Sequence, residues 1–113
     1  MDVDIDDIGI GRIDIDLFAD TPVTSENFYN LCVGKMSFKG SSFHHVKPYY
    51  RAVGGIVHGY GKPFDDENFK FKHTRGVLSM ENNNQKDNNT SMFFICLRDT
   101  PLHDGTNTVF GEV

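Results

Sequence analysis

Short strand-like segments, separated by turn-forming residues, recur along this chain of 113 residues and most constrain its fold. Apolar and polar residues alternate over 1–5 and 9–18, which predicts a hairpin that turns at Asp6-Asp7 and carries its aspartates on the solvent face. Further strands are predicted at 42–46, 50–54, 76–80, 92–96 and 108–113. Many short strands indicate a mainly β domain, a closed or nearly closed antiparallel β-barrel.

One stretch has helical rather than strand spacing. We expect a helix that begins at Thr21, whose side chain can cap it, and at Pro22, which suits a first turn because its missing N–H is not needed there. Phe28 and Leu31 lie on one face of this helix and are expected to plug one end of the space that the strands enclose. Gly34 is a natural stop.

The length of the chain predicts a single domain over residues 1–113 with one core. The formal net charge is −5, and no basic face is apparent, so nucleic-acid binding is not expected. No apolar run approaches the roughly 20 residues of a membrane span, and the acidic N-terminus is unlike a targeting peptide. We expect two reduced cysteines, no membrane contact and an intracellular location, in the cytoplasm with the nucleus as alternative.

Residues 56–74 show little periodicity and are predicted to form an irregular loop pinned by Phe64, Phe69 and Phe71. His73, at the end of this loop, is expected to make local hydrogen bonds. The histidines and cysteines have no metal-ligand spacing, so no metal site is predicted, and no cofactor is expected.

Eight blocks along the chain occur in the order typical of one protein family. They are G-R-I-D-I-D-L-F-A-D (11–20), P-V-T-S-E-N-F-Y-N-L-C-V-G (22–34), F-K-G-S-S-F-H-H-V (38–46), G-G (54–55), F-D-D-E-N-F-K-F-K-H-T (64–74), G-V-L-S-M (76–80), N-N-T-S-M-F-F-I-C (88–96) and L-H-D-G-T-N-T-V-F-G-E-V (102–113). On these blocks the chain resembles the cyclophilins, the cyclosporin-binding family of peptidyl-prolyl cis-trans isomerases. The resemblance implies an antiparallel barrel capped by helices, with a proline-binding groove on its outer face.

An X-Pro isomerase must favour the twisted amide, for which it needs a dry aromatic pocket, a cation or donor aimed at the proline nitrogen, and hydrogen bonds to the flanking backbone. The resemblance places the family's catalytic arginine at His45, which is shorter and mostly neutral at pH 7. We therefore expect weak activity. Arg51 either substitutes for the missing cation or is a solvent-facing strand residue.

The resemblance also implies the residues of the substrate groove. Phe94 is expected to wall the proline pocket, with Tyr50 and Leu102 beside it. Val53 replaces a backbone-binding glutamine, and Glu81 puts a carboxylate where substrate backbone should lie. The complete predicted substrate-binding set is Tyr50, Arg51, Val53, Glu81, Asn82, Met92, Phe94, Leu102, His103 and Asn107.

Two functional hypotheses remain open at this point. The first is an isomerase of weak activity that acts on proline-containing peptides or proteins; the second is an inactive pseudo-enzyme that binds such segments or a protein partner. Cyclosporin binding is expected to be weak or absent. Relative to the family, the last helix and the closing strand are missing after Val113. Three explanations stay open: the chain is a fragment, a partner or a second copy covers the open barrel edge, or the domain is marginally stable.

Overall fold

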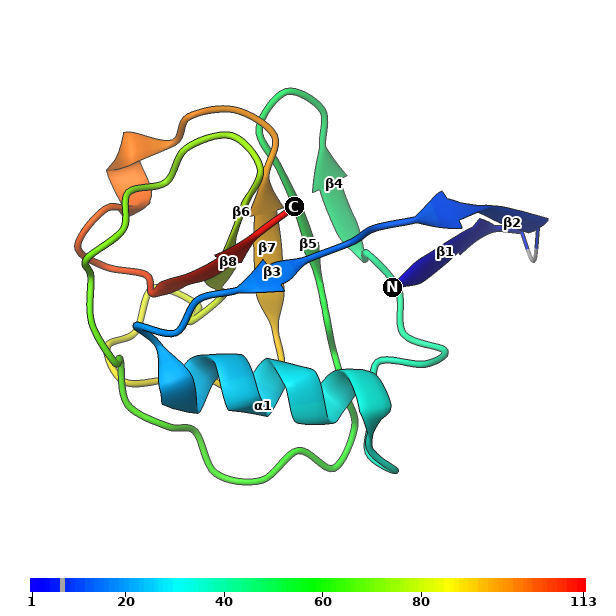
Figure 1. The fold of residues 1–113 in the computed structure, drawn as a ribbon, viewed down its shortest axis with the longest axis horizontal. Helices are drawn as coiled ribbons and strands as arrows, with labels where there is room; N and C mark the ends of the chain where they lie inside the picture. The colour runs from blue at the N-terminus through cyan, green and yellow to red at the C-terminus, as the bar shows by residue number, and fades with distance from the viewer. Residues whose placement is uncertain (7) are drawn as a thin grey trace.

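The computed structural model describes residues 1–6 and 8–113, and most of its strands form one antiparallel sheet (Figure 1). The strand order is β3-β8-β6-β7-β5-β4, with β3 and β4 at the two edges. The strands of this sheet are β3 (Asp16–Leu17), β4 (His45–Lys47), β5 (Arg51–Gly54), β6 (Val77–Met80), β7 (Phe93–Cys96) and β8 (Val109–Glu112). The prediction of a mainly β, antiparallel fold is confirmed.

The N-terminal hairpin is separate from this sheet. Within the described residues, strands β1 (Asp2–Ile5) and β2 (Ile8–Arg12) pair only with each other, and they project from the body of the molecule (Figure 1). The predicted single strand over 9–18 was wrong, because β2 ends at Arg12 and the chain then joins β8 through β3. Ile5 is 60% exposed on the projecting hairpin. Asp7, in the predicted turn, lies outside the described residues.

The two faces of the sheet carry separate apolar clusters, because successive side chains of a strand point to opposite faces. One face packs Leu78, Phe93 and Phe110 against Phe28 of helix α1 (Pro22–Val33). The other face holds a second cluster, which contains Val53, Val77, Phe94, Cys96 and Val109. The prediction that 92–96 contains a strand buried on both faces is therefore confirmed for β7. The second face is where the candidate site lies.

Helix α1 covers the first face, and its N-terminus is bound by a carboxylate that is distant in the sequence. The predicted boundaries are confirmed, with Pro22 in the first turn and Gly34 after the last. The predicted side-chain cap was wrong, since the hydroxyl of Thr21 makes no capping bond. Instead Glu67 accepts hydrogen bonds of 2.9 Å from the backbone nitrogens of Val23 and Thr24. The free N–H groups of the first turn are thus satisfied from the irregular loop.

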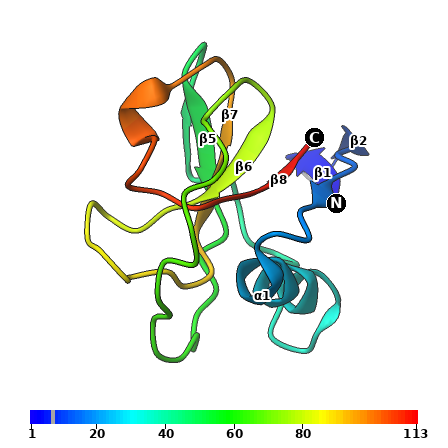
Figure 2. The same ribbon diagram turned by 60° about the vertical axis from the view of Figure 1, so that its left-hand side comes forward.

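The loops between the strands follow the prediction with small shifts. The predicted strand at 42–46 was misplaced, because β4 occupies only His45–Lys47. Residues 56–74 are irregular apart from one bridge between Phe64 and Asn89, and they run around the sheet (Figure 2). A short 3-10 helix, η1 (Pro101–His103), lies beside the site. No described helix is both long enough and apolar enough to cross a bilayer.

Candidate functional site

The candidate site is centred on the ring of Phe94, in the middle of β7. Backbone pairing places Phe94 between Val53 of β5 and Ser79 of β6, on the second face of the sheet. Its ring is stacked on His73 with centroids 5.9 Å apart and tilted against His103 at 5.1 Å. Phe94 is fully buried, at 0% exposure. The ring that the sequence predicts as a pocket wall is therefore covered by other side chains.

An ion pair covers part of this ring. Arg51 begins β5 and lies two residues before Val53, so both side chains point to the face that holds Phe94. The guanidinium carbon of Arg51 is 4.9 Å from the Phe94 ring centroid. Its Nη1 donates a hydrogen bond of 2.8 Å to Oε2 of Glu81, and these two side chains are only 21% and 11% exposed. Arg51 is thus turned toward the site rather than toward solvent.

The other carboxylate oxygen of Glu81 is also engaged. Oε1 accepts a hydrogen bond of 3.0 Å from the backbone nitrogen of Asn83, which fixes the carboxylate at the end of β6. Arg51 Nε is buried, and among the described residues it finds no hydrogen-bond acceptor. The pair therefore leaves one guanidinium donor unsatisfied, a group that is costly to bury.

Tyr50 and His103 form the second side of the site. The hydroxyl of Tyr50 and Nε2 of His103 share a hydrogen bond of 2.8 Å, and the two rings are stacked with centroids 6.0 Å apart. Burial lowers the pKa of His103, and the positive charge of Arg51 lowers it further, against the opposing effect of Glu81. His103 is therefore neutral at pH 7, so one of its two ring nitrogens acts as a hydrogen-bond acceptor.

His73 anchors the irregular loop beneath the Phe94 ring. Its Nδ1 contacts Asp104 at 2.8 Å and its Nε2 contacts the hydroxyl of Ser79 at 2.8 Å. The prediction of local loop hydrogen bonds was wrong, because both side-chain partners lie on other elements of the fold. Burial lowers the pKa of His73 despite the opposing effect of Asp104. Ser79 is fully buried, so this serine–histidine–aspartate chain supports the ring and exposes no nucleophile.

Most of the remaining predicted residues do not gather around the ring. His45 on β4 and Leu102 on η1 are exposed, Leu102 at 66%. The amide nitrogens of Asn82 and Asn107 donate to the backbone oxygens of Thr106 and Met80, so they hold loops in place. Met92 is half-buried against the Phe94 cluster. The structure thus brings together seven of the predicted residues: Tyr50, Arg51, Val53, Glu81, Met92, Phe94 and His103.

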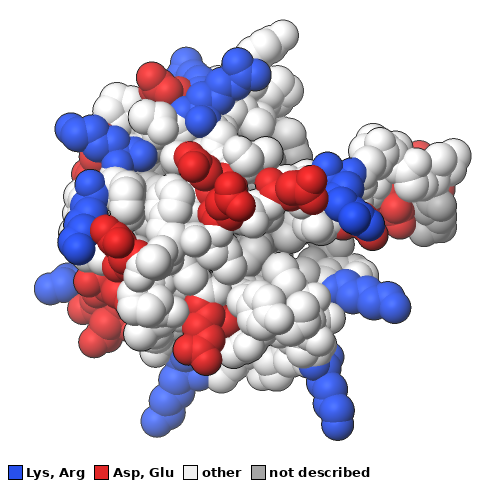
Figure 3. Space-filling view, viewed as in Figure 1, with Lys and Arg blue, Asp and Glu red and all other residues white. Residues whose placement is uncertain are grey.

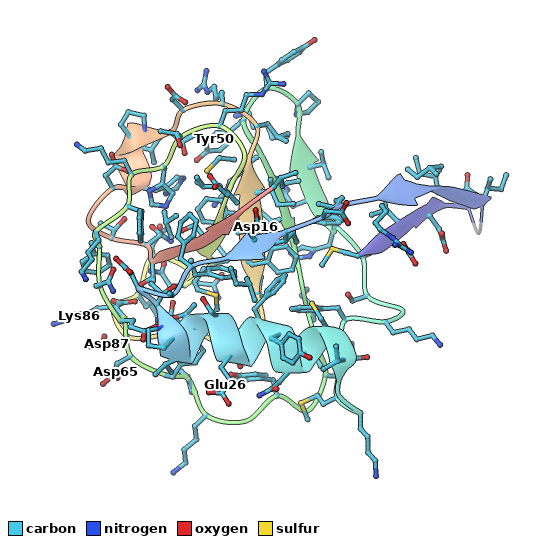
Figure 4. All side chains as sticks on the ribbon, in the orientation of Figure 1. Asp16, Glu26, Tyr50, Asp65, Lys86 and Asp87 are labelled. Carbon is cyan, nitrogen blue, oxygen red and sulfur yellow. The ribbon has the colours of Figure 1, made fainter. Side chains whose placement is uncertain are left out.

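Two further cations lie near Tyr50 and were not predicted as site residues. Lys47 Nζ is 5.5 Å and the Arg98 guanidinium carbon 5.8 Å from the Tyr50 ring centroid. Figure 4 labels Tyr50 in the same orientation as Figure 3. In the space-filling view of Figure 3, Lys and Arg side chains gather at this end of the sheet. Lys47 is three residues before Tyr50 in the sequence, whereas Arg98 is brought close to Tyr50 only by the fold.

Two surface hollows lie away from this cluster. The first, of about 510 Å³, is lined by residues 35–37, 39–42 and 56–58, and the second, of about 400 Å³, by Val23 and residues 64–67. None of the residues that surround Phe94 lines either hollow. Because the Phe94 ring is fully buried, the site is a covered aromatic cluster in this structure.

Comparison with known proteins gives a match over the whole chain. The family model described as cyclophilin type peptidyl-prolyl cis-trans isomerase/CLD matches residues 1–113.

Proposed function

Because the chain belongs to the cyclophilin-type peptidyl-prolyl cis-trans isomerase family, we propose that it accelerates the cis–trans isomerisation of X-Pro bonds in proteins, and that it does so weakly. The barrier to this rotation is about 18–20 kcal/mol and is maintained by amide resonance. A site lowers it by binding the twisted amide better than the planar one, with no covalent step.

The observation that carries this proposal is the position of the Arg51 guanidinium, 4.9 Å from the Phe94 ring centroid. His45, at the position of the family's arginine, is exposed on edge strand β4. Arg51 instead supplies a permanent cation beside the aromatic ring that is expected to grip proline. A cation there can stabilise the localised lone pair of the proline nitrogen in the twisted state.

The activity is expected to be weak for two reasons. The carboxylate of Glu81 already neutralises Arg51 at 2.8 Å, so the cation is shared between partner and substrate. The Phe94 ring is fully buried, so a proline ring must displace the covering side chains before it binds. Both requirements raise the free energy of the bound transition state.

The neutralisation of Arg51 by Glu81 favours a second candidate function, a proline-segment binding module without turnover. A covered ring that opens to admit a peptide supplies affinity, but only a correctly aimed donor supplies rate. The fold is common to both functions, so the fold itself does not decide between them.

NMR exchange measurements on an Ala-Pro peptide test the proposal. We expect the protein to raise the cis–trans rate above the uncatalysed value, and Phe94→Ala to abolish this increase. Phe94→Leu, which keeps more of the core volume, controls for loss of folding and is expected to lose most of the increase. A peptide that binds with an unchanged exchange rate would establish the binding-module function instead.

A further inference from the structure

Three cationic side chains surround the Tyr50 ring at the edge of the site. The charged atoms of Lys47, Arg51 and Arg98 lie 5.5, 5.3 and 5.8 Å from its centroid. The chain as a whole carries a formal net charge of −5, so this cluster is opposite in sign to the rest of the molecule. Glu81 bonds to Arg51 alone among the three. The edge of the site therefore retains positive charge.

Arg51 also retains unused bonding capacity. An arginine can give a carboxylate two parallel hydrogen bonds, but here Nη1 alone reaches Glu81. Its buried Nε has no acceptor among the described residues. An additional or replacement anion would satisfy this donor, whereas an apolar group at the same place would leave it unsatisfied.

The free-energy cost of opening the site differs between neutral and anionic peptides. To uncover Phe94, a bound segment must move the Arg51 guanidinium, which weakens its contact with Glu81. A neutral segment leaves Arg51 without a charged partner and Glu81 with only its bond from the Asn83 backbone, which is unfavourable. A segment that brings its own anion gives Arg51 a new partner as Glu81 is released. The new bond offsets the free-energy cost of opening the site.

We propose that the site selects X-Pro segments in which a residue adjacent to the proline carries a carboxylate or phosphate group. This specificity rests on the proposed function, because it concerns the same proline site. Arg51 is the specificity-determining residue that exchanges Glu81 for the substrate anion, and Lys47 and Arg98 add attraction at longer range.

Titration of the protein with matched peptides, followed by its amide NMR shifts, tests this specificity. The peptides differ only beside the proline: alanine on both sides, glutamate before it, glutamate after it, phosphoserine before it, and lysine before it. We expect one or both glutamate peptides to bind at least about fivefold more tightly than the alanine peptide, and the lysine peptide to bind more weakly. The preference should shrink between about 0.05 M and about 0.5 M NaCl, because salt screens exposed charges. Phosphoserine against glutamate distinguishes a phosphate from a carboxylate ligand.

Charge-removing variants identify the cations that act. Arg51→Met is expected to bring the affinity ratio of glutamate to alanine peptide close to one, and Arg98→Gln to reduce it about twofold. Lys86→Gln removes the same charge from a loop far from Tyr50 in Figure 4 and should leave the ratio unchanged. The ratio is measured within each variant, so a general loss of affinity does not affect it.

The possible results separate the two proposals. If the alanine peptide binds and exchanges as well as the glutamate peptides, the anionic specificity is wrong and the isomerase proposal stands. If Arg51→Met and Lys86→Gln leave equal preferences, the assignment to Arg51 is wrong. If no peptide binds at millimolar concentration, both proposals fail.

Discussion

At the scale of single residues, the site is defined by what covers Phe94. The structure pairs Arg51 with Glu81 at 2.8 Å, and the Arg51 guanidinium lies over the Phe94 ring. The sequence alone predicts a substitute cation or a solvent-facing residue at Arg51 and, separately, a carboxylate at Glu81 where substrate backbone should lie. The fold makes them one feature, because β5 and the end of β6 lie on either side of β7.

The first residue-scale prediction concerns Glu81. Glu81→Ala removes the carboxylate that shares Arg51, so both the cation and the ring become more available to substrate. We expect the exchange rate of a neutral Ala-Pro peptide to rise about threefold to tenfold, which corresponds to about 1 kcal/mol of barrier. NMR exchange measures this rate, and Glu26→Ala on the exposed side of α1 is the matched control. An unchanged or lower rate would show that Glu81 does not restrain the site.

A second prediction concerns pH. Burial lowers the pKa of His73 and His103 in the folded protein, so between their folded values and the ordinary value of 6.5 the unfolded chain binds more protons. The free energy of unfolding therefore falls as the pH drops below about 6.5, by at most about 1.4 kcal/mol per pH unit for each histidine. Urea unfolding between pH 7.5 and pH 5.5 checks this. His73→Gln should flatten the dependence, and stability that is constant over this range would contradict the account.

At the scale of elements, the local sequence pattern predicted the positions of the helix and of most sheet strands. The helix and four of the sheet strands were placed within a residue or two, because apolar periodicity reports burial directly. The break between β2 and β3 was not predicted, since the alternation of Ile13 and Ile15 with Asp14 continues through it. Only pairing with β8, almost a hundred residues later, requires the chain to leave the hairpin there.

The same reasoning explains the missed helix cap. Thr21 has the right side chain and the right position, yet Glu67 takes the free N–H groups from a loop 43 residues away. Burial opposes ionisation of Glu67, but the hydrogen bonds from Thr24 and Val23 lower its pKa overall. A carboxylate at a helix N-terminus also interacts favourably with the helix dipole.

The element-scale prediction is that Glu67 stabilises the fold through α1. Glu67→Gln should lower the free energy of unfolding by about 1 kcal/mol, in the range of a lost helix cap. Glu26→Gln, an exposed carboxylate on the same helix, should change it by less than about 0.5 kcal/mol. Urea denaturation of the two variants measures the difference. Equal effects would mean that Glu67 acts only through its charge on the surface.

At the scale of the whole molecule, the described sheet has two unpaired edges, β3 and β4. The hairpin β1–β2 projects beside them, with Ile5, Ile8 and Ile10 between 56% and 67% exposed. That a partner or a second copy covers these surfaces stays a prediction. Unpaired strand edges and exposed apolar side chains are the features that promote such association.

Sedimentation velocity as a function of concentration tests this association. We expect the protein to self-associate, and the double substitution Ile8→Thr and Ile10→Thr to weaken association at least about fivefold, because it removes apolar surface. A chain that remains monomeric at all concentrations would contradict association between copies.

The sequence predicted which residues form the site better than it predicted whether the site is open or closed. Phe94, Tyr50 and Arg51 were assigned to one region, and the fold does bring them together. Whether the pocket is open was not predictable, because closure depends on contacts of Arg51 with Glu81 and of Tyr50 with His103 across different elements. The role of His73 was missed for the same reason.

The central claim is that Arg51, rather than His45, supplies the cation of the site. The most direct measurement is the NMR exchange rate of an Ala-Pro peptide with the wild-type protein, Arg51→Met and His45→Gln. The account predicts a rate above the uncatalysed value for wild type, a return to the uncatalysed value in Arg51→Met, and little change in His45→Gln. A rate that survives Arg51→Met, or that is lost in His45→Gln alone, would contradict it.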